Sequence, residues 1–282
     1  MNNRNIDMSS CLRRYTQSRC NLCIDICPEH AITEGHIDQE SCTGCGLCTA
    51  VCPVGAIASA NDYAASLSRI FDMEQTVLAC RNIDPGGPEC LGFLNRRILS
   101  AIGMVRGAAI DISRCAGCNP AVADWLEKEL NAANDALESS HRPKIKTTVV
   151  QPPKKKPSPV SNVSRRHLFS ELMKSVRSGL KSAVPQNTMP ERFNAQNAVA
   201  VPLPDSLQPG ITVSTGCTAC HLCVTVCPAN ALQMTRTDKE IIFIFRPEAC
   251  IACNLCVDHC PKDVLTLIPS FDGERIKKIP RS

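Results

Sequence analysis

The side chains best able to do chemistry in this chain are its twenty cysteines, whose spacing is regular. Three runs place cysteines at their first, fourth, seventh and eleventh positions and end in proline: 42–53, 217–228 and 250–261. In such a run, three thiolates separated by two residues can wrap three irons of one cubane, whereas the fourth lies out of reach and binds the neighbouring cluster. The apolar residues after each proline can shield a cluster from water and tune its potential. The spacing therefore predicts [4Fe–4S] clusters.

A fourth copy of the run lies near the start of the chain and departs from the pattern. Cys20, Cys23, Cys27 and Pro28 are in order, but eight residues separate the leading Cys11 from Cys20, where the other runs have two. If Cys11 does not bind iron, we expect a three-iron or labile cluster there. The four copies form two pairs, one near each end of the chain, as a duplication with an insert would produce.

At these residues the sequence resembles the bacterial-type 2[4Fe–4S] ferredoxins, in duplicated form. The resemblance covers residues 9–62 and 211–270, and it implies in each a small α+β ferredoxin fold with two clusters. It also implies crossed ligand sets, in which the last cysteine of each run binds the cluster of its neighbour. The implied C-terminal sets are Cys217, Cys220, Cys223 and Cys260, and Cys250, Cys253, Cys256 and Cys227. By analogy, the N-terminal sets are Cys11, Cys20, Cys23 and Cys52, and Cys42, Cys45, Cys48 and Cys27.

Zinc sites and disulfides are the other common uses of so many cysteines. Zinc favours paired Cys-x2-Cys knuckles over triplets. The first nineteen residues are polar and contain no apolar signal segment, so we expect a cytoplasmic protein with reduced thiols, in which disulfides are rare. The longest mostly apolar stretch, 98–112, is interrupted by Arg106 and is too short to cross a bilayer, so we expect no membrane span.

The remaining four cysteines lie in residues 70–138, which we expect to form a small α/β insert. These are Cys80, Cys90, Cys115 and Cys118. Two of them directly follow predicted strands at 76–79 and 107–113, and Asn119 with Pro120 is a typical start for the helix that follows. Because ligands bind at the carboxyl ends of parallel strands, the four cysteines could converge there. Three interpretations stay open: a further Fe–S cluster, a structural zinc site, or free redox-active thiols.

Residues 139–210 are expected to be a flexible, basic linker. The proline- and lysine-rich segment 151–159 should be extended, and leucine and valine at four-residue spacing predict one helix from Ser164 to Ala183. The segment 164–169 resembles a twin-arginine export motif. Its position inside the chain and the charged residues that follow it argue against a working signal.

The overall composition suits a protein that is held together by bound clusters. Only ten residues are aromatic, so a large aromatic core is not available, and the stacking side chains that single-stranded nucleic acid requires are missing. The formal charge of +4 treats the cysteines as neutral. Four clusters with thiolate ligands would bring the loaded protein to roughly −4.

The sequence favours a multi-cluster protein that relays single electrons between redox partners, as a subunit or docking partner of a larger oxidoreductase. It contains no dinucleotide fingerprint, P-loop or nucleophile elbow, so an electron-transfer protein is a better interpretation than an enzyme with its own substrate site. The alternative is a maturation or assembly factor that supplies electrons or clusters to a cofactor-containing reductase. A third interpretation, an enzyme with a substrate site in 75–138, depends only on the extra cysteines.

Overall fold

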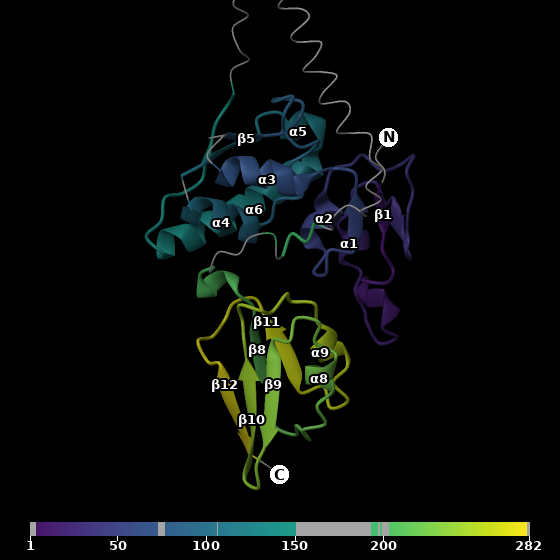
Figure 1. Ribbon diagram of the computed structural model, residues 1–282, viewed down its shortest axis with the longest axis vertical. Helices are drawn as coiled ribbons and strands as arrows, with labels where there is room; N and C mark the ends of the chain where they lie inside the picture. Colours follow the sequence, from purple (N-terminus) through teal and green to yellow (C-terminus); the bar gives the residue numbers. More distant parts are fainter. Residues whose placement is uncertain are drawn as a thin grey trace, which may run out of the picture. The chain divides into compact units, whose positions relative to one another are not determined.

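A computed structural model of the protein describes residues 4–72, 77–105, 107–150, 193–196, 198 and 203–280 (Figure 1). All of these residues belong to one compact unit. The predicted helix at 164–183 and the twin-arginine-like segment lie outside the described residues. The described residues mix helices and strands, which confirms an α+β class. Across this part of the chain, no helix combines the length and the apolar character needed to span a bilayer.

Residues 4–59 form two small antiparallel sheets. The first strand pairs with the last, and a two-stranded hairpin lies between them in the chain. The strands are β1 (Arg4–Ile6), β2 (Ile32–Thr33), β3 (His36–Ile37) and β4 (Ile57–Ser59). The helical elements are the 3-10 turn η1 (Leu12–Arg14), α1 (Leu22–Asp25) and α2 (Leu47–Val51). Ile32, Ile37 and Ile57 from these strands share one buried cluster with cysteines of the two runs.

The described residues between 63 and 147 combine a parallel sheet with four helices. The strands, in sheet order, are β5 (Val77–Ala79), β6 (Ala109–Asp111) and β7 (Lys146–Thr147). The helices are α3 (Tyr63–Phe71), α4 (Arg96–Val105), α5 (Cys115–Cys118) and α6 (Pro120–Ser139). The two predicted strands and the predicted helix start are confirmed. The Asn119 side chain accepts a hydrogen bond from the Val122 amide at 3.2 Å, and Pro120 occupies the first turn, where its missing N–H costs nothing.

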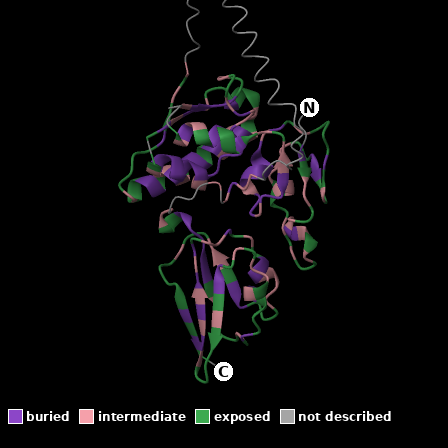
Figure 2. Ribbon diagram, in the orientation of Figure 1, coloured by how far each residue is buried: buried purple, intermediate pink, exposed green. Residues whose placement is uncertain are grey.

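Residues 205–280 repeat the strand pairing of the first segment with longer strands. The 3-10 turn η2 and the helices α8 and α9 are Asp205–Leu207, Leu222–Thr225 and Leu255–Asp258. The strands are β8 (Gly210–Val213), β9 (Leu232–Arg236), β10 (Glu240–Phe245), β11 (Leu265–Ile268) and β12 (Ile276–Pro280). β8 pairs with β11, and the β9–β10 hairpin is widened by β12. Buried and less buried residues alternate along β10, as expected for a strand with one face on a core (Figure 2).

One hydrophobic core joins α2 to the parallel sheet and its helices. This core contains Leu47 of α2, Tyr63 of α3, Leu126 of α6, and Phe93 from the loop before α4. The rings of Tyr63 and Phe93 stack with their centroids 4.2 Å apart. Burial of a side chain the size of Phe93 contributes about 1.5–3 kcal/mol to folding. This core therefore fixes the second cysteine run firmly against residues 63–147.

Candidate iron–sulfur sites

The four cysteine runs adopt one repeated backbone arrangement. Each run continues into a short helix that begins at the leucine before its third cysteine and stops just before its fourth. The residue three positions beyond the fourth cysteine is left-handed in every copy: His30, Gly55, Asn230 and Asp263, with φ of 49°, 61°, 49° and 49°. These are the residue types that tolerate this conformation best. The shared Pro-x-His/Gly/Asn/Asp signal is therefore part of the motif.

Three of the runs also share two left-handed residues inside the cysteine triplet. The pairs are Gly44 and Gly46, Ala219 and His221, and Ala252 and Asn254. An alanine in this conformation costs on the order of 1 kcal/mol, and such strain concentrates at functional loops. The first run, which has the displaced leading cysteine, lacks this feature: Asn21 precedes its helix with φ of −121°. The irregular spacing is thus matched by an irregular loop.

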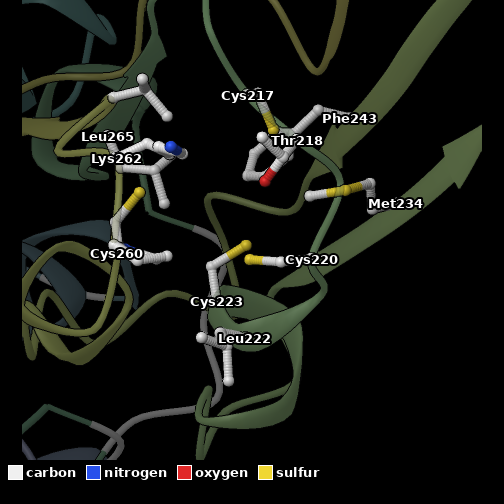
Figure 3. Close-up of a pocket in the computed structure, with 12 residues that line it drawn as sticks. Cys217, Thr218, Cys220, Leu222, Cys223, Met234, Phe243, Cys260, Lys262 and Leu265 are labelled. Carbon is white, nitrogen blue, oxygen red and sulfur yellow. The ribbon is translucent and has the colours of Figure 1, made fainter.

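In the C-terminal segment, the structure brings each crossed set of four cysteines together around its own cavity. The first cavity encloses about 350 Å³ of empty space, and Figure 3 shows its four cysteine side chains arranged around a common space with Phe243 and Met234 beside them. The second encloses about 340 Å³ and includes Phe245 in its wall. The first is lined by Cys217, Cys220, Cys223 and Cys260. The second is lined by Cys227, Cys250, Cys253 and Cys256. Thiolates in an apolar surrounding are the donors that iron–sulfur clusters take, so these residues fit the group.

In the N-terminal segment, the thiols are close enough to interact electrostatically in the arrangement that the resemblance implies. Burial raises the pKa of Cys23 to about 12, and the nearby Cys52 and Cys11 add to that rise. Burial likewise raises the pKa of Cys20, with Cys52 and Cys11 again nearby. Cys11 therefore lies near Cys20 and Cys23, and the turn η1 occupies the first part of the segment between Cys11 and Cys20. Cys27 in turn lies near Cys45 of the second set.

Backbone amides donate hydrogen bonds to the crossing cysteines at equivalent places in two runs. The Ala56 N–H donates to Cys52 Sγ at 3.2 Å, and the Ala231 N–H donates to Cys227 Sγ at 3.3 Å. Hydrogen bonds of this kind stabilise the more negative, reduced form of a cluster and raise its potential. The chain thus provides both the ligands and part of their electrostatic tuning.

Arg4 is a residue of this region that sequence reasoning missed. Its side chain is 1% exposed, and its Nη1 lies 3.8 Å from Cys48 Sγ and 3.1 Å from Thr49 Oγ1. Its Nη2 donates to the Gly44 carbonyl at 2.9 Å and to the Tyr63 hydroxyl. Burial alone would lower the pKa of Arg4, but Tyr63 and Cys48 raise it, so the guanidinium stays charged. A single arginine carries no spacing signal, and only the β1–β4 pairing places it beside the cysteines.

The four cysteines of 70–138 come together in a third place. Cys80, Cys90, Cys115 and Cys118 line a solvent-open pocket that also has Cys45 in its wall, and its empty volume, open solvent included, is about 1190 Å³. No group of three or more His, Cys, Asp or Glu side chains among the described residues is arranged to hold a single metal ion. Tetrahedral zinc with bonds of about 2.3 Å draws its sulfur ligands to within about 4 Å of one another. Ligands that bind different irons of a cluster stand farther apart than this.

Comparisons with known families agree with the cysteine pattern at both ends of the chain. Residues 17–63 match the family model described as the LdpA Fe–S cluster-binding domain. Residues 216–265 match the model described as a 4Fe–4S dicluster domain. No curated protein matches the chain. The chain therefore carries ferredoxin-type iron–sulfur modules, and neither matched range includes Cys11 or the four cysteines of 70–138.

Proposed function

We propose that the protein is a multi-cluster electron carrier that relays single electrons between redox partner proteins, as a subunit or docking partner of a larger oxidoreductase. In this proposal two ferredoxin-like modules, 9–62 and 211–270, each hold two [4Fe–4S] clusters. They flank the α/β insert, 70–138, and the basic linker, 139–210. The observation that carries the proposal is that each crossed set of C-terminal cysteines lines its own apolar cavity.

The chain's residues would act as ligands, shields and sources of charge. A [4Fe–4S] cluster supplies one-electron exchange between its 2+ and 1+ states. The crossed cysteines hold it on four corners, while Phe243 and Phe245, each at most 1% exposed, exclude water from the two C-terminal cavities. Exclusion of water makes the extra negative charge of a reduced cluster more costly. Amide donors and a buried cation offset this cost, so the cluster can still be reduced.

The two sites of each module are close enough to exchange electrons. Cys256 of one C-terminal set interacts electrostatically with Cys223 of the other, and Cys23 does so with Cys48 in the N-terminal segment. The crossing cysteines connect the sites further, because each continues directly from the helix that carries a ligand of the neighbouring site. This arrangement supports transfer of electrons within a pair.

A redox titration followed by EPR tests the relay on anaerobically purified full-length protein. We expect reversible one-electron signals with the spin–spin splitting of neighbouring reduced clusters. A Cys260→Ser variant should lose the signal of one C-terminal cluster, and Ser214→Ala, which leaves the ligand sets intact, should not. Clusters that cannot be reduced and reoxidised reversibly would contradict the relay.

A pull-down from native extract separates the relay from an assembly role. Retention of an oxidoreductase complex in stoichiometric amounts supports the relay, because a permanent subunit is recovered together with its complex. Transient binding to a cofactor-free reductase, lost once its cofactor is inserted, would support an assembly factor in its place.

A further inference from the structure

The parallel sheet brings two of the insert cysteines to one edge. β5 and β6 pair in parallel, with Ala79 opposite Asp111. Cys80 directly follows the end of β5, and Cys115 begins the single-turn helix α5 just after β6. Both side chains are buried and belong to the hydrophobic cluster that packs around the sheet. The carboxyl edge of a parallel sheet is where ligands bind in α/β folds.

The other two insert cysteines are brought to the same edge by local turns. α5 carries Cys118 one turn after Cys115. The loop after β5 folds back on itself, since the Arg81 amide donates to the Pro88 carbonyl at 2.7 Å, and this returns Cys90 toward the strand end. A Cβ on Gly87 would lie 2.1 Å from the Ala79 carbonyl oxygen, so only glycine permits this close approach.

Polar contacts hold the mouth of the site in place. The Asn82 amide lies 3.8 Å from Cys118 Sγ, and Arg114 Nη1 donates to the Asn82 carbonyl at 3.1 Å. Cys118 is exposed, whereas Cys80 and Cys115 are buried. One ligand is therefore reached from solvent, two are shielded, and Cys90 is intermediate in exposure.

The insert site adjoins one of the N-terminal cluster sites. Cys45 lines the same cavity as the four insert cysteines and lies near Cys90. The two backbones touch, because a Cβ on Gly92 would stand 2.3 Å from the Cys45 carbonyl oxygen. A Cβ on Gly46 would stand 2.9 Å from the Phe93 amide nitrogen. The contact is built from glycines on both sides, which lets the two cysteine-bearing loops approach as closely as backbones can.

We propose that Cys80, Cys90, Cys115 and Cys118 hold a fifth iron–sulfur cluster, which exchanges single electrons with the cluster held by Cys27, Cys42, Cys45 and Cys48. In each exchange the N-terminal cluster passes from 1+ to 2+ as the insert cluster passes from 2+ to 1+, and no proton or ligand is transferred. The exchange part of this proposal rests on the proposed function of the N-terminal module. The binding part stands on the four cysteines alone.

Iron and sulfide counts on the anaerobic full-length protein test the binding part. We expect about eighteen irons if the insert cluster is [2Fe–2S] and about twenty if it is [4Fe–4S], against about sixteen for the terminal sites alone. Cys118→Ser, at an exposed position, should remove the corresponding two or four irons and leave the irons of the terminal sites in place. Cys115→Ser should do the same, and Ser113→Ala, two residues away, should change nothing.

Two results would overturn the binding part. One is about sixteen irons in both the wild-type protein and Cys118→Ser; the other is one zinc per chain that disappears in Cys118→Ser. A protein with few irons at the terminal sites would instead refute the proposed function, so the two failures are distinguishable.

Electron-spin relaxation tests the exchange part. In the partly reduced wild-type protein, the signal of the adjoining N-terminal cluster should be broadened by its paramagnetic neighbour. Cys118→Ser should sharpen that signal and leave the C-terminal signals unchanged. An identical N-terminal signal in both proteins, with the insert irons present in the wild type, would refute exchange between the two sites.

Discussion

Replacement of Arg4 by glutamine should lower the reduction potential of the cluster site formed by Cys27, Cys42, Cys45 and Cys48. Arg4 is the buried positive charge beside this site, and reduction adds one negative charge to a cluster. The charge therefore stabilises the reduced form more than the oxidised form. Its removal should make the cluster harder to reduce.

The size of the effect follows from the distance between the charges. Arg4 Nη1 lies 3.8 Å from Cys48 Sγ. At an effective dielectric constant of about 20, two unit charges at this separation interact by about 4 kcal/mol. Since 59 mV corresponds to about 1.4 kcal/mol for one electron, the ceiling is about 170 mV. The added electron is spread over the whole cluster and lies farther away on average, so we expect a fall on the order of 100 mV.

A potentiometric titration monitored by EPR measures this shift, with the C-terminal clusters of the same chain as the internal reference. Arg4→Lys keeps the charge and should shift the potential much less than Arg4→Gln. Tyr63→Phe removes a hydrogen-bond partner of Arg4 without a charge and serves as the control for altered packing. An Arg4→Gln protein with full iron content and four unshifted potentials would refute the electrostatic role of Arg4.

Three further predictions concern assembly, pH and packing. Cys11→Ser should lower the iron count by about one to four and produce the EPR signal of an oxidised three-iron cluster; an unchanged count and spectrum would show that Cys11 is not a ligand. Burial raises the pKa of Cys223 from 9.0 to about 11 in the cluster-free fold. The folded chain therefore holds this proton more tightly than the unfolded chain, so the cluster-free protein should be most stable below pH 9 and lose stability as the pH rises toward 11. Thermal unfolding at pH 7 and pH 10 measures this difference, and equal transition temperatures would contradict it. Gly92→Ala should destabilise the fold by about 1–3 kcal/mol, because its Cβ would meet the Cys45 carbonyl oxygen at 2.3 Å. The control is Gly117→Ala, whose Cβ would meet nothing within 4 Å and which should be tolerated. Equal melting temperatures for the two variants would count against the close contact.

Local signals in the sequence were sufficient to predict several elements. The strands before Cys80 and Cys115 are short apolar runs with clear ends, and the helix after Asn119 has a capping side chain and a proline in its first turn. The crossed ligand sets came from the resemblance to 2[4Fe–4S] ferredoxins, and in the C-terminal segment each implied set lines one cavity.

Features that depend on packing between distant segments could not be read from the sequence. Arg4 reaches Cys48 only because β1 pairs with β4, and the stack of Phe93 on Tyr63 brings the insert against the second cysteine run. The pairing of β12 with β10 arises beyond the last cysteine run. None of these contacts has a local pattern, since each side chain alone would suit an ordinary core or surface position.

Mössbauer spectroscopy combined with iron and sulfide analysis, on 57Fe-labelled protein prepared without oxygen, tests the central claim that the crossed cysteine sets each hold a cubane. We expect about sixteen irons per chain in [4Fe–4S] sites, in addition to any irons of the insert. A preparation that is colourless, or whose terminal cysteines carry zinc or disulfide bonds, would contradict it.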